Sequence, residues 1–154
     1  MKPRCSALAL AALACLSLGA QAPAPTPAQA ETLVKRAVAY AKQHGIEKLI
    51  NQTNQADGVF HVGSGSQLYI FIYDLKGVCK AIGYNTTALV GKDRSDLKDP
   101  DGKMIVREFI TTAKTKGQGW VDYKYPNPVN GKIEDKTSFV ELSDGLIIGS
   151  GVYK

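Results

Sequence analysis

The residues best suited to hold a small molecule are aromatic side chains on two predicted strands. Tyr69, Phe71 and Tyr73 alternate along an apolar segment and therefore share one face of a β-strand. Trp120 and Tyr123 lie on opposite faces of a later strand if that strand is regular, so only one of them can line a given pocket unless a β-bulge intervenes. Aromatic walls are typical of small-molecule sites. For each of these side chains the alternative is a place in the core of the sheet.

Lys136 is the charged residue of a predicted strand that could hold an anionic group. An ammonium group in a half-buried strand forms a charge-assisted hydrogen bond with a ligand carboxylate. The alternative is a solvated lysine at a strand edge, and Asp122 and Arg107 are expected at the surface. The predicted ligand-binding residues are therefore Tyr69, Phe71, Tyr73, Trp120, Tyr123 and Lys136.

Catalytic and metal chemistry have little support in the sequence. An enzyme needs a nucleophile with a base, or paired carboxylates in a cleft, and neither His44 nor His61 has a partner at motif spacing. The sequence contains no Cys–His pair at metal-site spacing and no glycine-rich phosphate loop. Cys79 lies in an apolar strand pattern, which indicates a buried, inert thiol. We expect no enzymatic activity, no catalytic residue, no metal and no cofactor.

The N-terminus has the pattern of a secretory signal peptide. Lys2 and Arg4 precede an apolar, uncharged run over residues 6–19. At about 14 residues this run is shorter than the roughly 20 that a membrane-spanning helix needs. An uncleaved anchor and a lipoprotein modified at Cys15 are the less favoured alternatives. The pattern predicts a periplasmic or secreted protein.

Small-residue cleavage signals end at Ala22 and at Ala30, and the sequence leaves both sites open. Residues 1–22 are therefore predicted as signal peptide, 23–30 as a Pro/Ala-rich spacer, and 31–154 as one domain of ordinary size. Loss of the signal peptide lowers the formal net charge from +5 to about +3, without any basic block, so nucleic-acid binding is poorly supported.

Hydrophobic periodicity predicts helices and five strands in this domain. An amphipathic helix covers residues 32–43, with a short helix after Gly45, and a later helix begins at Asp99 and Pro100 and ends at Gly117. Strands are predicted over residues 68–73, 78–84, 119–125, 136–142 and 146–153. This order predicts an α+β fold with a five-stranded antiparallel sheet. Because the first strand is apolar on both faces, a helix has to cover each side of it.

Several short segments follow one another in a fixed order through the domain. They are YIFIYD (69–74) with Gly77, LVGK (89–92), DLKD (96–99) with Asp101 and Gly102, GQGWVDY (117–123) with Pro126, KTSFV (136–140) and IIGSGVY (147–153). In this order and spacing the chain resembles a single Cache domain, the extracytoplasmic relative of the PAS fold, over residues 31–154.

The resemblance implies a long N-terminal helix on one face of the sheet, with helix and loop elements on the other. It also implies a sensor module that binds a small organic molecule, such as a carboxylate, and acts in signal transduction and chemotaxis. It matches Lys136 to a lysine that points toward the ligand in similar domains. The implied partners are a membrane receptor or kinase and, through the N-terminal helix, a second copy in a homodimer. Because the chain stops at Lys154, we expect a stand-alone, soluble form.

Two features of the strands bear on the ligand. Many relatives have a histidine where this chain has Ile82, so the ligand inferred for them does not transfer by resemblance alone. Gly149 and Gly151 share a face of the last strand, which indicates close approach by a ligand or by a helix. A second hypothesis therefore stays open, namely a non-catalytic protein-interaction or structural domain without a small-molecule ligand.

Overall fold

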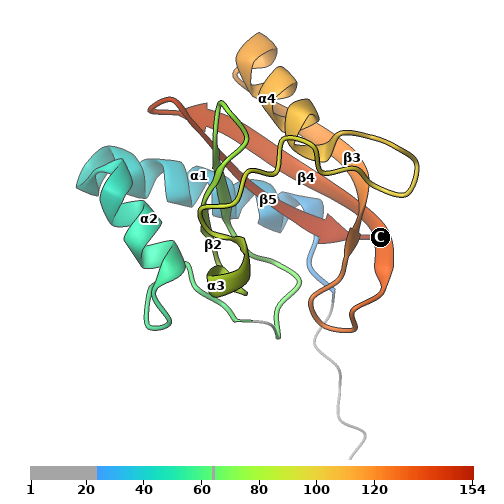
Figure 1. The fold of residues 1–154 in the computed structure, drawn as a ribbon. Coiled ribbons are helices and arrows are strands. Elements are labelled where there is room, and N and C mark those ends of the chain that lie inside the picture. Colours follow the sequence, from blue (N-terminus) through green and yellow to red (C-terminus); the bar gives the residue numbers. More distant parts are fainter. Residues whose placement is uncertain (1–23, 64) are drawn as a thin grey trace, which may run out of the picture.

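The computed structural model describes residues 24–63 and 65–154, so the predicted signal peptide and the Ala22 cleavage site lie outside the described residues. The elements follow in the order α1 (Pro27–His44), α2 (Ile46–Asn54), β1 (Phe71–Asp74), β2 (Cys79–Ile82), α3 (Thr86–Leu89), α4 (Ile105–Lys116), β3 (Gln118–Pro126), β4 (Ile133–Ser143) and β5 (Leu146–Tyr153) (Figure 1).

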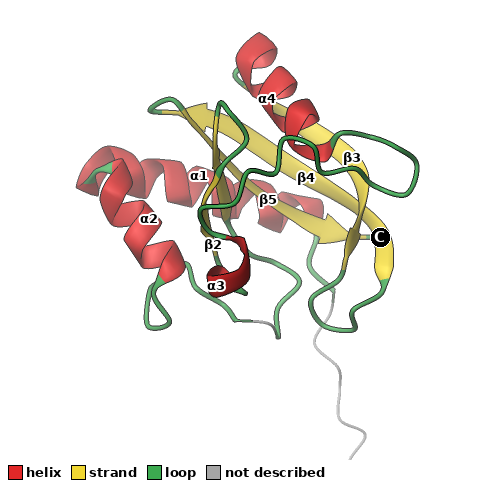
Figure 2. Ribbon diagram, viewed as in Figure 1, coloured by secondary structure: helices red, strands yellow, loops and turns green. Residues whose placement is uncertain are grey.

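The strands form one antiparallel sheet in the order β2-β1-β5-β4-β3, which confirms the predicted α+β fold (Figure 2). Strands β1 and β2 pair with each other, and after α4 the chain forms β3, β4 and β5, each paired with the next. Asp144 and Gly145 both have positive φ, at 50° and 75°, in the two-residue turn between β4 and β5. Such a turn matches the twist of the strands, as the Ser-Asp-Gly sequence predicted.

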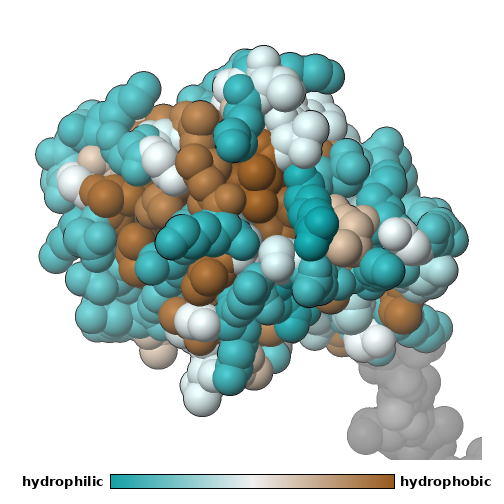
Figure 3. Space-filling model, turned by 45° about the horizontal axis from the view of Figure 1, so that its top comes forward, coloured by the Kyte–Doolittle hydropathy of each residue, from teal (hydrophilic) through white to brown (hydrophobic). Residues whose placement is uncertain are grey.

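Each face of the sheet carries its own apolar core, because helices lie on both sides (Figure 1). Ile70 and Ile72 belong to the cluster formed with α1 and α2, whereas Phe71 and Tyr73 belong to the cluster formed with α4. The six-residue apolar run around β1 is thus explained by burial on both faces, as predicted. The face of the molecule shown in Figure 3 is mostly hydrophilic, with an apolar area at its centre.

Helix α1 begins earlier than the sequence analysis predicted. Thr26 caps it, since its side chain accepts a hydrogen bond from the backbone of Gln29 while the Gln29 side chain bonds back to the Thr26 backbone. Pro27 occupies the first turn, where its missing N–H costs nothing. Ala30 is fully buried. The prediction of a spacer is therefore wrong for residues 27–30, which form the first turn of the helix.

Helix α4 begins later than predicted. It starts at Ile105, so Asp99 is not its N-cap. The carboxylate of Asp99 instead accepts hydrogen bonds from the backbones of Asp101, Lys103 and Lys124, which close a turn and hold it against β3. The end of the helix was predicted correctly, because Gly117 has a φ of 75° and donates its N–H to the carbonyl of Ala113.

Helix α2 ends at Asn54, and the short helix α3 follows β2, whereas the β1 and β2 ladders are shorter than the predicted strands. The segment between α3 and α4 crosses the sheet face opposite α1 without regular structure (Figure 1). Together with α4 it covers the aromatic face, on which the candidate site lies.

Candidate functional site

The centre of the candidate site is a buried ammonium group. Lys136 lies on β4 and is 1% exposed. Its Nζ lies 2.7 Å from the hydroxyl oxygen of Tyr69 and 3.4 Å from that of Tyr153. The same nitrogen lies 4.1 Å and 4.5 Å from the ring centres of these two tyrosines and 5.6 Å from that of Tyr125. The group is held by cation–π contacts and hydroxyl groups.

The register of the sheet creates this arrangement. Lys136 pairs with Tyr123 on β3 and with Tyr153 on β5, so the three side chains stand side by side on one face. Tyr125 follows two residues after Tyr123 on that same face. Tyr69 lies in the segment before β1, and its hydroxyl contacts the Lys136 ammonium group.

Lys136 has no counter-ion among the residues that the structure describes, since none of the ion pairs found there includes it. Glu134 is two residues away on the same strand face, but its carboxylate accepts hydrogen bonds from Asn127 and Asn130, at 2.7 and 2.8 Å. Burial therefore lowers the pKa of Lys136 well below its usual range. A buried charge without a partner is unfavourable, so an anion beside Nζ would stabilise the ammonium form.

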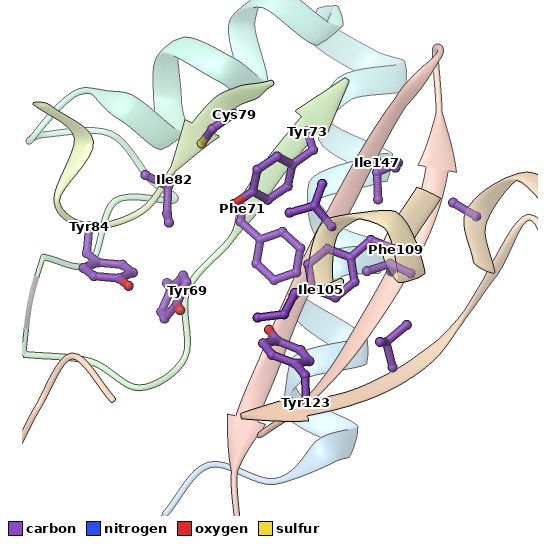
Figure 4. Packing of buried hydrophobic residues seen from close by; sticks show 14 residues of the cluster. Tyr69, Phe71, Tyr73, Cys79, Ile82, Tyr84, Ile105, Phe109, Tyr123 and Ile147 are labelled. Atoms are coloured by element: carbon purple, nitrogen blue, oxygen red, sulfur yellow. The ribbon is translucent and has the colours of Figure 1, made fainter. Parts of the chain in front are cut away.

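A small aromatic cavity lies beside Tyr69, the hydrogen-bond partner of Lys136. Figure 4 shows Tyr69, Phe71, Tyr73, Ile82 and Tyr123 of its wall among the buried side chains on this face of the sheet. The cavity measures about 20 Å³ and is lined by Tyr69, Phe71, Tyr73, Ile82, Leu97, Ile105, Phe109, Tyr123 and Tyr125. A space of this size accommodates roughly one water molecule. A larger ligand would therefore have to displace part of the wall. Tyr69 and Leu97 are the lining residues that lie outside the helices and strands.

The tyrosine hydroxyls of the site can act as hydrogen-bond donors at neutral pH. Burial raises the pKa of Tyr69 and of Tyr123 well above the usual value for tyrosine. Tyr123 shares a hydrogen bond of 2.8 Å with the hydroxyl of Ser138 on the neighbouring strand. Tyr153 donates to the carbonyl of Pro126 at 2.8 Å. Because the Tyr153 proton is donated to Pro126, the donors available to a carboxylate here are the Lys136 ammonium and the neutral Tyr69 hydroxyl, which accepts from Lys136 and keeps its own proton.

The structure brings together most of the residues that the sequence suggested. Tyr69, Phe71, Tyr73 and Tyr123 line the cavity, and Lys136 lies directly behind Tyr69. Trp120 is not part of this group. It lies on the opposite face of β3, 40% exposed and with its ring 5.4 Å from that of Phe139.

Other members of the group were not found by sequence analysis. Tyr125 shares the face of Tyr123 by simple alternation, a signal that was present in the sequence. Tyr153 joins through strand register, and Leu97, Ile105 and Phe109 through the packing of α4 and its preceding loop. These contacts link segments far apart in the chain, and local periodicity carries no information on them.

The two strand features noted in the sequence have structural explanations. Ile82 lines the cavity and is 2% exposed, so it supplies apolar wall. Gly149 makes room for a ring of the neighbouring strand, because a Cβ there would lie 2.2 Å from Cε2 of Phe71. The close approach is thus made by Phe71 and not by a ligand or a helix.

A twisted antiparallel sheet with helices on both faces and a small enclosed cavity on one of them defines a PAS-like sensor domain. The chain belongs to the single Cache domain 2 family, whose model matches residues 29–154. Within the described part of the chain, no helix combines the length and the apolar character needed to cross a membrane.

Two relatives are signalling proteins. The sensor histidine kinase MctS of Rhizobium johnstonii is 38% identical over 91 residues, which cover 58% of this chain and 19% of the kinase. The methyl-accepting chemotaxis protein McpP of Pseudomonas putida is 39% identical over 64 residues, which cover 40% of this chain and 12% of that protein. This chain therefore spans only a small part of the length of these relatives.

One solved structure is similar over most of the domain. It is that of a Cache chemosensory domain, reported as the structural basis for carboxylic acid recognition, and it is 29% identical with a TM-score of 0.61. The match covers 80% of this chain and 84% of that one. The protein is thus a Cache sensor domain related to chemotaxis receptors and sensor kinases.

Proposed function

We propose that this protein binds a small carboxylate, with Lys136 as the residue that pairs with the carboxylate group. The observation that carries the proposal is the burial of Lys136 without a counter-ion in the described part of the chain, in hydrogen-bond contact with Tyr69, which lines the aromatic cavity. The Tyr69 hydroxyl, 2.7 Å from the ammonium nitrogen, is placed to donate to the same carboxylate. The aromatic and aliphatic walls then receive the hydrocarbon part of the ligand.

Similarity to a solved Cache domain supports a carboxylate as the class of ligand. A Cache domain of similar fold was solved for its recognition of carboxylic acids. The buried lysine gives this chain a group of suitable charge, whereas Ile82 contributes only apolar surface. We therefore expect Lys136 to be the main residue that binds the negatively charged group of the ligand.

We further propose that the domain works in the periplasm, where it senses its ligand and passes the signal to a membrane receptor or kinase. The predicted signal peptide supports an extracytoplasmic location, and the family supports a sensing role. The related kinase and chemotaxis receptor indicate the kind of membrane partner that such a module serves. A homodimer through α1 remains a prediction of the family resemblance.

A ligand screen by thermal unfolding tests the binding proposal. Linear carboxylates of increasing chain length are compared with the amides of the same acids, using the wild-type protein, Lys136→Met and Lys124→Met. Lys124 is a matched control, because it lies on the neighbouring strand and forms an ion pair with Asp101 at the surface. Binding raises the melting temperature in proportion to the logarithm of ligand excess.

We expect at least one acid, and none of the amides, to raise the melting temperature of the wild type and of Lys124→Met. Lys136→Met should not respond. If no carboxylate shifts the wild type, the hypothesis of an interaction domain without a ligand replaces this proposal. If Lys136→Met responds as the wild type does, the site lies elsewhere.

A further inference from the structure

A second cation lies in a hollow that the proposed carboxylate site does not use. Arg94, in the segment between α3 and α4, lines an open cleft of about 390 Å³. Its backbone is fixed on both sides, since its N–H donates to the carbonyl of Gly77 and its carbonyl accepts from Leu97. The side chain therefore starts from a rigid position.

Arg94 forms no ion pair within the described residues, whereas neighbouring charged groups form ion pairs or hydrogen bonds. Its Nε is buried and donates to no acceptor within residues 24–63 and 65–154, and no ion pair found there includes it. By contrast, Arg107 pairs with Asp96 at 2.8 Å, and Lys124 pairs with Asp101 at 2.8 Å. The carboxylate that lines the cleft, that of Asp99, is occupied by three backbone N–H groups.

The rest of the cleft is largely apolar. Its walls include Leu97, Ile105, Tyr125, Pro126 and Ile133. Ile133 is 58% exposed, which is high for a large aliphatic side chain. Lys98 adds a second positive charge at the edge of the cleft. An occupant that fits therefore has an apolar body and a negatively charged group.

Geometry favours a carboxylate as that charged group. A guanidinium group is planar and offers parallel N–H donors, which match the two oxygens of a carboxylate. Arg94 and Tyr125 both line the cleft, and the positive charge of Arg94 partly offsets the increase in the pKa of Tyr125 that burial causes.

We propose that the Arg94 cleft is a second anion site, which takes a carboxylate with an aromatic or branched apolar body. The carboxylate binds the guanidinium group, and the body packs on Leu97, Ile105 and the ring of Tyr125. This site goes beyond the proposed Lys136 site, since Arg94 is no part of the enclosed cavity and the cleft is far larger. The two spaces share the walls Leu97, Ile105 and Tyr125, so occupation of one affects the shape of the other.

Benzoate is a suitable probe, because its ring is too large for the enclosed cavity of about 20 Å³ as it stands. Benzyl alcohol serves as the uncharged control. Binding is followed by two-dimensional NMR of the isotope-labelled wild type and of Arg94→Gln, Arg94→Lys, Lys98→Gln and Lys136→Met. The thermal unfolding of each variant verifies that it is folded.

We expect benzoate, and not benzyl alcohol, to shift the backbone signals of Leu97, Ile105 and Tyr125. Arg94→Gln should weaken the affinity by about tenfold or more, since a charge-assisted hydrogen bond is lost. The benzoate affinity of Arg94→Lys should lie between those of the wild type and Arg94→Gln, because lysine keeps the positive charge but lacks the paired N–H donors. Lys98→Gln, which removes the charge at the edge of the cleft, should weaken the affinity less than Arg94→Gln does. Lys136→Met should bind benzoate within about twofold of the wild type.

Three results would overturn this second site. They are the absence of any benzoate shift in the wild type, equal affinity in Arg94→Gln, and loss of benzoate binding in Lys136→Met alone. The last result would place benzoate in the lysine site and leave the carboxylate proposal intact. Conversely, failure of the ligand screen at Lys136 leaves the Arg94 experiment unaffected.

Discussion

The hydroxyl group of Tyr69 lies 2.7 Å from the ammonium group of Lys136, although 67 positions separate the two residues in the chain. This contact joins the segment before β1 to the middle of β4. It gives a buried cation a hydrogen-bond partner and the face of an aromatic ring but no negative charge. Because no negative charge balances the ammonium group, both its effect on stability and its affinity for a carboxylate can be predicted.

Replacement of Lys136 by methionine should maintain or raise the stability of the protein in the absence of ligand. Methionine fills a similar volume and removes a group whose charged form is disfavoured by burial, so the variant should be at least as stable as the wild type. Thermal and urea unfolding measure the effect. The control Lys124→Met, which removes a surface charge from the adjacent strand, should leave stability nearly unchanged. A marked loss of stability in Lys136→Met would show that the ammonium group has a counter-charge after all.

Carboxylate binding at Lys136 should take up a proton. Burial lowers the pKa of Lys136 in the free protein, and the ligand carboxylate supplies the missing counter-charge, which raises that pKa in the complex. Between the two pKa values the affinity therefore falls as pH rises, by about tenfold per pH unit. Calorimetry at one pH, in two buffers with different ionisation enthalpies, counts the protons. Binding without proton uptake at neutral and mildly alkaline pH would contradict a lowered pKa in the free site.

Gly149→Ala should destabilise the fold by about 1–3 kcal/mol, as overpacking of a core does. The added Cβ would lie 2.2 Å from Cε2 of Phe71 and 3.0 Å from a methyl group of Val140, so the ring would have to move into the cavity. Chemical unfolding gives the magnitude. Gly65→Ala is the matched control, because a Cβ there meets no atom within 4 Å. Equal stability of both variants would mean that the Phe71 ring is free to shift.

If the predicted signal peptide is removed, we expect the mature chain to begin at Pro23 and not at Glu31. Cleavage after Ala30 would remove the Thr26 cap and the buried Ala30 from helix α1. Loss of an N-cap alone costs about 1 kcal/mol, so a chain that starts at Glu31 should melt about 3–5 °C below one that starts at Pro23. N-terminal sequencing of the secreted protein checks the cleavage site. Glu31 as the first residue would show that α1 forms without this turn.

Much of the architecture was predictable because it depends on local patterns. The apolar run around Phe71 predicted a strand buried on both faces. The order of helices and strands along the chain predicted a five-stranded antiparallel sheet. Alternation placed Tyr69, Phe71 and Tyr73 on one face and separated Trp120 from Tyr123. Each of these statements needs only the period of a strand and the type of each residue.

The errors fall where contacts between distant segments override a local signal. Asp99 followed by Pro100 has the pattern of a helix start, but the carboxylate of Asp99 also binds the backbone of Lys124 on β3, and a turn satisfies it better. The segment 27–30 has the composition of a spacer. Its buried alanine, Ala30, nevertheless packs in the core, and Thr26 supplies the cap that begins the helix there.

The sequence by itself determined the class of fold, the aromatic face and the presence of a lysine on a central strand. Only the tertiary structure decided that this lysine is fully buried, that Tyr153 and Tyr69 surround it, and that no carboxylate reaches it in the described part of the chain. The physical reason is register. A shift of one residue between β4 and β5 would turn Lys136 away from Tyr153, and no local pattern fixes that pairing.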